Sequence, residues 1–185
     1  MIETERLILR LPVPDDALAI SEAITDAEVM RFIGAGETRT LDDAVEHVQW
    51  MLRAWSEDGF GPLIVVRKAD GEPLGGIGLI AWDPSCWRIG IRAEIGEQAE
   101  IELGWTLSRR AWGFGYATEA AVAAQDWALR EIQPRRLISL IHPENTRSMR
   151  VATKIGESYE REITTHRGIP AQLWAFKLPP STERE

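Results

Sequence analysis

The sequence is poor in the features that mark secreted and membrane-spanning chains. Its 185 residues contain one cysteine, Cys86, so no intrachain disulfide can form and a reducing cytoplasm is the expected compartment. We expect Cys86 to pack as a small hydrophobic side chain. The apolar runs fall far short of the roughly 20 residues that a membrane-spanning helix needs. The opening residues, MIETERLILRLP, are charged and strand-like, unlike a signal peptide.

Several common motifs are also absent. There is no G-x-G-x-x-G and no G-x-x-x-x-G-K-[ST], which excludes the two common phosphate-binding loops. No G-x-S-x-G occurs and Cys86 has no sequence context that marks it as reactive, so no nucleophile is indicated. The three histidines, His47, His142 and His166, lie far apart without metal-ligand spacing, and we expect no metal site.

Length, composition and charge suit one domain. Hydrophobic residues make up 44% of the chain, enough for a sizeable core. The formal net charge of −8 argues against nucleic acid as the main partner and is compatible with cationic amines, although solubility alone accounts for it equally well. We therefore expect no nucleic-acid or membrane partner, and a monomer or homodimer.

Hydrophobic periodicity and turn residues divide the chain into alternating strands and helices. Strands are expected at 6–11, 63–67, 74–81, 87–92, 100–107, 137–141, 157–165 and 171–178, and helices at about 15–24, 40–57, 117–130 and 145–155. The polar residues 179–185 form a tail. Elements mixed in this way predict a single α/β domain with a mixed sheet, spanning residues 1–178.

The most informative stretch is a strand, a glycine-bearing turn and a helix in direct succession. Residues 101–107 alternate like a strand, with Glu102 on the polar face. Alanines recur at helical spacing from Ala117 onward. Between them, Gly113 and Gly115 let the backbone approach a ligand closely, and the N–H groups that begin the helix are free. The stretch therefore predicts an anion-binding site, although a plain structural turn is the alternative.

Three runs, ELGWTL, WGFGYATEAA and HPENTRSMRVATKIG, resemble the GNAT superfamily of acyl-CoA N-acyltransferases. They are most similar to its branch of ribosomal-protein N-terminal acetyltransferases, the RimJ/RimL-like enzymes. The superfamily's cofactor motif, Q/R-x-x-G-x-G/A, falls on Trp112, Gly115 and Ala117. Tryptophan replaces Gln or Arg at the first position, as it often does in that branch. The resemblance covers residues 2–178 and is specific over 102–156.

The resemblance implies a fold and a cosubstrate. The fold is a mostly antiparallel sheet flanked by helices and splayed at the cofactor site. Acetyl-CoA would bind with its pyrophosphate on N–H groups from Gly113 to Thr118, and its pantetheine between the strands ending at Leu107 and Ile141. A backbone N–H near Leu103 would polarise the thioester carbonyl. The implied cofactor-binding residues are Trp105, Leu107, Trp112, Gly113, Phe114, Gly115, Ala117, Thr118 and Asn145.

Two side chains are candidates for catalysis. In the family, a glutamate on the strand before the turn often accepts the amine proton, which implies Glu102 as the base. Glu100 shares its face, so Glu100, a water chain or a merely solvated Glu102 remain alternatives. A base that works near neutral pH needs a pKa raised by burial.

In the resembled branch, a serine after the next strand lies near the CoA thiol, which implies Ser148 as a donor to the leaving thiolate. Many other members use a tyrosine there, and none occurs between Tyr116 and Tyr159. Asn145 would contact the pantetheine arm. Both residues could instead only cap the helix, where Ser and Asn are favoured.

The implied activity is transfer of an acetyl group from acetyl-CoA to a primary amine, by direct attack without a covalent enzyme intermediate. The amine is either a protein N-terminal α-amine or a small molecule. The alternatives are a non-catalytic CoA-binding or sensor module, and an interaction domain with an empty cleft.

Overall fold

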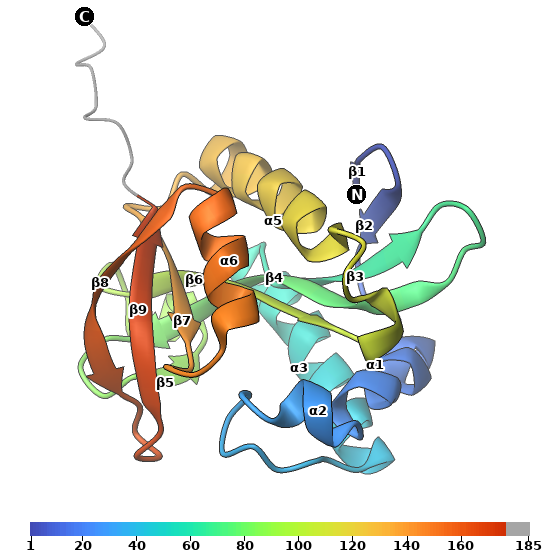
Figure 1. The fold of residues 1–185 in the computed structure, drawn as a ribbon. Helices are drawn as coiled ribbons and strands as arrows, with labels where there is room; N and C mark the ends of the chain where they lie inside the picture. Colours follow the sequence, from blue (N-terminus) through green and yellow to red (C-terminus); the bar gives the residue numbers. More distant parts are fainter. Residues whose placement is uncertain (177–185) are drawn as a thin grey trace, which may run out of the picture.

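The structure is a computed structural model that describes residues 1–176 (Figure 1). Its strands are β1 (Ile2–Glu3), β2 (Leu7–Arg10), β3 (Pro62–Arg67), β4 (Pro73–Asp83), β5 (Arg88–Gly90), β6 (Glu100–Leu107), β7 (Leu137–Ile141), β8 (Glu157–Thr164) and β9 (Pro170–Phe176). Its helices are α1 (Ala17–Ile24), α2 (Ala27–Met30), α3 (Leu41–Asp58), α4 (Arg92–Ile95), α5 (Tyr116–Trp127) and α6 (Thr146–Lys154). The predicted tail, 179–185, and the predicted domain end at Leu178 lie outside the described residues.

The strands form one mixed sheet. Its order is β1-β2-β3-β4-β6-β7-β9-β8, and β5 pairs with the far end of β4. Neighbouring strands are antiparallel except β6 and β7, which run parallel. The predicted class, a mostly antiparallel sheet flanked by helices, is therefore confirmed.

The parallel strands separate soon after they meet. Their ladder places Ile101 opposite Leu137 and Glu102 opposite Ile138, and it holds no later pair among the described residues. On its other side, β6 stays paired with β4 from Glu100 to Leu107. The sheet is therefore splayed between β6 and β7, and the edge of β6 after Glu102 has no strand partner.

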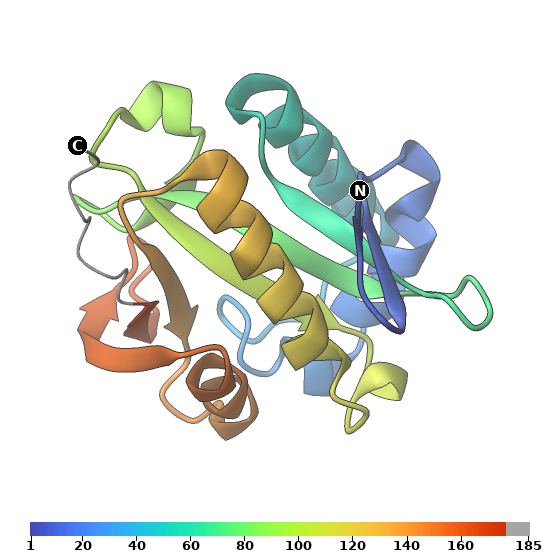
Figure 2. The same ribbon diagram turned by 90° about the horizontal axis from the view of Figure 1, so that it is seen from above.

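Helices cover both faces of the sheet (Figures 1 and 2). Helices α5 and α6 lie on one face, and α1, α2 and α3 lie on the other. On α5, Ala120, Ala121 and Ala124 are almost fully buried in the main core. Because these side chains are small, the helix packs close to the strands it crosses. Helix α5 begins after the turn that follows β6, one of the two strands that border the splayed region.

Local sequence signals set the ends of the long helices. Thr40 begins α3 with a capping box, because its hydroxyl accepts the Asp43 N–H while the Asp43 carboxylate accepts the Thr40 N–H. Gly59 ends α3 in the left-handed conformation, with φ of 71°. Both ends agree with the sequence prediction.

Three local features differ from the prediction. A short helix, α2, lies within the polar segment 25–40 because the Asp26 side chain caps it through the Glu28 N–H. The strand predicted at 87–92 shrinks to β5 and is followed by α4, since Trp87 has a φ of 52°, outside the strand region. Helix α5 ends earlier than expected and continues as a π-turn over Ala128–Ile132.

The expectation that Cys86 is buried was wrong. Asp83 accepts hydrogen bonds from the N–H and hydroxyl of Ser85, which fixes a tight turn between β4 and β5. Cys86 lies on the outside of this turn and is exposed. None of the described helices is long and apolar enough to cross a membrane.

Candidate active site

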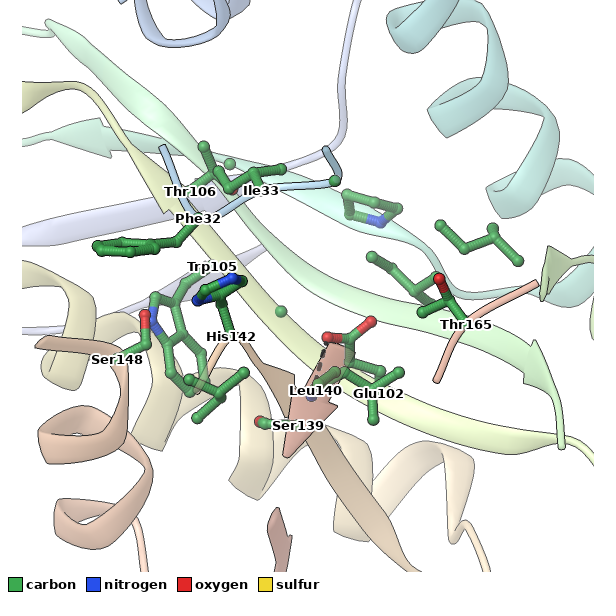
Figure 3. Close-up of a pocket in the computed structure, with 18 of the residues that line it drawn as sticks. Phe32, Ile33, Glu102, Trp105, Thr106, Ser139, Leu140, His142, Ser148 and Thr165 are labelled. Carbon is green, nitrogen blue, oxygen red and sulfur yellow. Dashed lines mark hydrogen bonds between the residues drawn. The ribbon is translucent and has the colours of Figure 1, made fainter. Parts of the chain in front are cut away.

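A cleft of about 630 Å³ opens where the sheet is splayed (Figure 3). Its floor is formed by β4, β6 and β7, and its walls by α1, by the segment from α2 to α3 and by the turn between β8 and β9. The residues predicted for chemistry that line it are Glu102, Trp105, Asn145 and Ser148. Figure 3 shows Ser148 and Glu102 in separate parts of the cleft, with His142 and Trp105 between them.

Glu102 lies on the floor of the cleft and is 8% exposed. One carboxylate oxygen accepts a 2.6 Å hydrogen bond from Trp82 Nε1 on β4, and the other accepts a 3.2 Å bond from the Leu140 N–H on β7. The carboxylate thus bridges the two strands that flank β6. These contacts fix its orientation at the point where β6 and β7 separate.

Burial raises the pKa of Glu102 to about 7, although the hydrogen bonds from Trp82 and Leu140 act in the opposite direction. A carboxyl group with such a pKa changes charge close to neutral pH. It can therefore hold a proton that it takes from a neighbouring amine, which an ordinary carboxylate with a much lower pKa does poorly.

The alternative base, Glu100, is engaged elsewhere. It is also buried, but its carboxylate forms a two-bond ion pair with Arg136, at 2.8 and 2.9 Å, and a longer contact with Arg135. Glu100 does not line the cleft. Of the two glutamates on the polar face of β6, only Glu102 faces the space where a substrate could bind.

A second buried carboxyl group lies next to this region and was missed in the sequence. Glu157 is 4% exposed, and its Oε1 lies 3.1 Å from the Ser139 hydroxyl, which also donates a 2.8 Å bond to the Leu103 carbonyl. A hydroxyl has one hydrogen, so Ser139 cannot donate fully to both oxygens, and a protonated Glu157 carboxyl would complete the pair by donating to Ser139 instead. Burial and the nearby charge of Glu102 raise the pKa of Glu157 to about 8, which agrees with a protonated group.

The glycine-bearing turn, residues 112–118, has the backbone geometry of an anion site, and we call it the anion turn. Gly113 and Gly115 have φ of 84° and 82°, which favour glycine. Within residues 1–176, N–H groups from Gly113 to Thr118 donate no backbone hydrogen bond; the first helical bond runs from the Glu119 N–H to the Gly115 carbonyl. These free donors at the start of α5 fit the pyrophosphate of CoA.

Neighbouring side chains position the anion turn. The indole of Trp112 donates a 2.9 Å bond to the Leu107 carbonyl, and the Arg147 guanidinium lies 4.4 Å above the Trp112 ring. Leu107 itself is buried in the core, so it can contact a cofactor only through its backbone. Phe114 is 60% exposed and stacks on Tyr116.

A second support reaches the anion turn from the N-terminus; we call Thr4, Arg6 and Glu119 the N-terminal clamp. Glu119, in the first turn of α5, accepts bonds from the Thr4 hydroxyl at 2.5 Å, the Arg6 N–H at 2.9 Å and Arg6 Nε at 2.7 Å. Arg6 Nη1 also donates to the Phe114 carbonyl at 3.0 Å. The sequence offered no sign of this contact, because the residues lie 113 positions apart.

Asn145, directly before α6, and Ser148, within it, make different contacts. The Asn145 side chain accepts a 3.1 Å bond from the Ser148 N–H and so caps the helix. The Asn145 amide nitrogen and the Ser148 hydroxyl form no hydrogen bond within the described part of the chain, and both belong to side chains that line the cleft. His142 lies against the Phe32 ring and accepts the Glu144 N–H.

Comparison with known proteins places this geometry in a family. A family model described as an acetyltransferase (GNAT) domain matches residues 6–157. YkkB of Bacillus subtilis (strain 168), an uncharacterized protein, is 32% identical over 163 residues, which cover 86% of each chain. YnaD of the same strain, named an uncharacterized N-acetyltransferase, is 30% identical over 157 residues, covering 84% of this chain and 81% of that one. The structure of an acetyltransferase from Agrobacterium tumefaciens str. C58 aligns with a TM-score of 0.76 and 28% identity, covering 96% and 94% of the two chains.

Two more distant structures share the fold alone. AAC(6′)-Ib in complex with ribostamycin and coenzyme A aligns with a TM-score of 0.74 and 20% identity, covering 98% of this chain and 99% of that one. RimL, a ribosomal L7/L12 α-N-protein acetyltransferase in complex with coenzyme A, aligns with a TM-score of 0.73 and 15% identity, covering 93% and 94%. Because the family model spans most of the sequence, the chain belongs to the GNAT family and is an acetyl-CoA-dependent acetyltransferase.

Proposed function

We propose that the protein transfers the acetyl group of acetyl-CoA to the nitrogen of a primary amine by direct attack, with Glu102 as the base. The buried carboxylate of Glu102 carries this proposal, since it faces the cleft with a pKa raised to about 7. A module that only binds CoA would have no use for a carboxyl group that is costly to bury. This argues against the non-catalytic alternative.

The cofactor-binding roles rest on backbone geometry. The free N–H groups of the anion turn hold the pyrophosphate, and the diverging edges of β6 and β7 receive the pantetheine. The amide nitrogen of Asn145 donates to the pantetheine arm, while its oxygen caps α6. When bound, acetyl-CoA supplies the acetyl group in activated form, as a thioester. The residues of this chain orient it and exclude water.

The chemical step needs two proton-handling groups. Glu102 takes a proton from the amine nitrogen as the new C–N bond forms and the C–S bond breaks. The Ser148 hydroxyl, near the N-terminal end of α6, donates a hydrogen bond to the sulfur as negative charge develops there. A hydroxyl is too weak an acid to lose its proton, so water completes the transfer to the thiolate.

We assign the protein to the RimJ/RimL-like branch on the pattern of Trp112, Gly115 and Ala117, with Ser148 in place of a tyrosine. RimL and AAC(6′)-Ib share the fold equally well, so the assignment to this branch rests on the sequence pattern. The acceptor is then a protein N-terminal α-amine, as the name of RimL indicates for ribosomal L7/L12, or a small-molecule amine such as the ribostamycin bound to AAC(6′)-Ib. We expect the reaction to occur in the cytoplasm.

The test is a turnover assay with acetyl-CoA over a panel of N-terminal peptides, amino acids, polyamines and aminoglycosides, together with calorimetry of CoA binding. We expect CoA to bind and at least one amine to be acetylated. The Glu102→Gln variant should bind CoA normally but lose most turnover, whereas Glu162→Gln, an exposed glutamate on β8, should behave as the parent does. CoA binding without turnover of any amine would contradict the proposal.

A further inference from the structure

The charges that line the cleft are opposite in sign to the charge of the protein. The chain has 29 acidic and 21 basic residues. The cleft, by contrast, is lined by a single carboxylate, that of Glu102, and by three arginines, Arg39, Arg88 and Arg167. A substrate that enters this space therefore meets a local excess of positive charge.

The three arginines come from different parts of the fold and converge on the same space. Arg39 precedes α3, Arg88 is the first residue of β5, and Arg167 lies in the turn between β8 and β9. Across residues 1–176, none of them forms an ion pair, whereas arginines such as Arg136 and Arg110 each bind two carboxylates. Guanidinium groups present donors that match carboxylate and phosphate oxygens, so these three are available to an anionic ligand.

The hollow that adjoins the cleft has a different balance of charged side chains. The adjoining hollow shares Arg39 and Arg167 but also contains Glu37, Asp43 and Glu46. None of these acids lines the cleft, and Asp43 is held by Thr40 as part of the cap of α3. The lining of the cleft is therefore richer in cationic than in acidic side chains, although Asp43 interacts with Arg39 and Asp83 lies opposite Arg88 in the β4–β5 ladder.

His47 lies in the same cleft, and its pKa is affected by Arg39. It lies in the cleft wall, stacked on Trp50. Burial lowers its pKa to about 4, and the charge of Arg39 acts in the same direction. His47 is therefore neutral near pH 7 and adds no positive charge to that of the three arginines.

We propose that the acceptor is a primary amine that also carries a carboxylate or phosphate group, which Arg39, Arg88 and Arg167 bind while the amine faces Glu102. This inference rests on the proposed function and specifies its acceptor. Apolar side chains, including Ile33, Trp50 and Ile80, line the space as well and suit a carbon linker. A polyamine or aminoglycoside would place additional ammonium groups beside three guanidinium groups, which is unfavourable.

The test compares pairs of amines that differ only in charge. The pairs are O-phosphoethanolamine and ethanolamine, glutamate and glutamine, and peptides that begin Ala-Asp-Asp and Ala-Lys-Lys. We expect kcat/KM to favour the anionic member of at least one pair by tenfold or more, and the pair that responds identifies the source of the anionic group. Equal or greater rates for the neutral or cationic member of every pair would overturn the inference while leaving the proposed function intact.

Single substitutions of the three arginines test which side chains cause the preference for the anionic amine. Arg39→Gln, Arg88→Gln and Arg167→Gln should each lower the anionic-to-neutral ratio of kcat/KM about tenfold, chiefly through KM. Arg130→Gln, an exposed arginine after α5 outside the cleft, is the matched control and should keep the ratio. An unchanged ratio in all three variants would overturn the inference.

Calorimetry of the anionic members of the three pairs, with CoA present, separates this inference from the proposed function. If one of these amines binds the parent but binds the arginine variants weakly, and no turnover occurs, the arginine site stands and the proposed function fails. If the amine is acetylated and binds parent and variants equally, the proposed function stands and the inference fails.

Discussion

At the scale of single residues, the two buried carboxyl groups Glu102 and Glu157 differ in their surroundings and therefore in their roles. Glu102 has two hydrogen-bond donors and faces the cleft. Glu157 has one polar neighbour, Ser139, and its second oxygen has no partner within the described residues. The charge of Glu102 raises the pKa of Glu157 further. Glu102, whose carboxylate is stabilised by two hydrogen-bond donors, is therefore the group that ionises more readily and can act as a base.

The pH dependence of the reaction should report the ionisation of Glu102. A base acts only when it is deprotonated, so kcat/KM of the parent should fall as the pH drops below about 7. Glu102→Gln should lower kcat/KM by a factor on the order of 10²–10⁴ and abolish the decrease of kcat/KM below about pH 7, the acidic limb of the profile. The measurement is a pH profile of kcat/KM for both proteins, with CoA affinity as the control. A variant that keeps the limb near pH 7 would exclude Glu102 as the base.

Glu157 should affect stability rather than chemistry. Its pKa is raised in the folded state, so the folded protein holds this proton up to about pH 8, while the unfolded chain releases it near its usual pKa of 4.5. The associated stability is complete below that lower value and is lost as the pH rises through 8. Glu157→Gln mimics the protonated group, so its Tm should decline less than that of the parent between pH 5 and 9. Parallel Tm curves would show that Glu157 is not protonated in the fold.

The sequence located Glu102 because strand alternation and a nearby turn are local patterns. Its role as the base stays a prediction. Glu157, Ser139 and Trp82 could not be found in the same way. They reach Glu102 and Leu103 only through the pairing of β4, β7, β9 and β8, and that pairing is set by the packing of the whole sheet.

At the scale of helices and strands, the predicted and observed bounds agree most closely where local sequence signals are strong. The predicted bounds of β6 and β7 match the structure. The short helices α2 and α4 were missed because one turn of helix has no periodicity to recognise, and each depends on a cap or a contact at its start. For α4, that contact is the Asp58 carboxylate at the end of α3, which accepts the N–H groups of Arg92 and Ala93.

The anion turn gives a prediction that separates backbone strain from ligand binding. In Gly115→Val, a residue with a side chain would occupy a φ of 82°, which costs roughly 1–2 kcal/mol. The side chain would also stand among the free N–H groups. Gly59→Val, at the end of α3 with a φ of 71° and open space around it, carries the same strain far from the turn. We expect similar losses of Tm in both variants, but a tenfold or greater rise in the Kd for CoA only in Gly115→Val. Equal CoA affinities, measured by calorimetry, would place the pyrophosphate elsewhere.

The start of α6 allows the cap and the thiolate donor to be tested separately. Asn145 accepts the capping hydrogen bond, so Asn145→Ala should lower the free energy of unfolding by about 0.5–2 kcal/mol. The Ser148 hydroxyl makes no such bond among the described residues, so Ser148→Ala should lower kcat with little change in the denaturation midpoint. The measurements are kcat and the midpoint of urea denaturation for both variants. A fully active Ser148→Ala would leave the serine without a role in proton transfer.

At the scale of the whole molecule, composition does not indicate the charge of the cleft. The net charge of −8 is compatible with cationic partners, yet it does not describe the cleft, which is lined by three arginines and one carboxylate. Charge summed over a chain contains no information on how the fold distributes it. Arg39, Arg88 and Arg167 lie between 49 and 128 positions apart, and only the folded chain brings them to one space.

Two substitutions that remove opposite charges test how the N-terminal clamp affects CoA binding. Arg6→Gln removes a positive charge near the anion turn, together with the bonds to Glu119 and Phe114. Glu119→Gln removes a negative charge and weakens the contacts of Glu119 with Thr4 and Arg6. If the clamp acts through charge alone, the first variant should bind CoA more weakly and the second more tightly.

We expect both clamp variants to bind CoA more weakly, because the clamp holds the backbone of the anion turn in place. Arg6 is 44% exposed, so solvent screens its charge, whereas Glu119 is 17% exposed and accepts bonds from both Thr4 and Arg6. Although burial raises the pKa of Glu119, these bonds outweigh it and hold the pKa below its usual range. The stability that Glu119 contributes is therefore present at neutral pH and lost as the pH falls below that range. Calorimetric Kd values for CoA at low and high salt provide the measurement. Tighter binding by Glu119→Gln would show that charge, and not the position of the turn, is what the clamp controls.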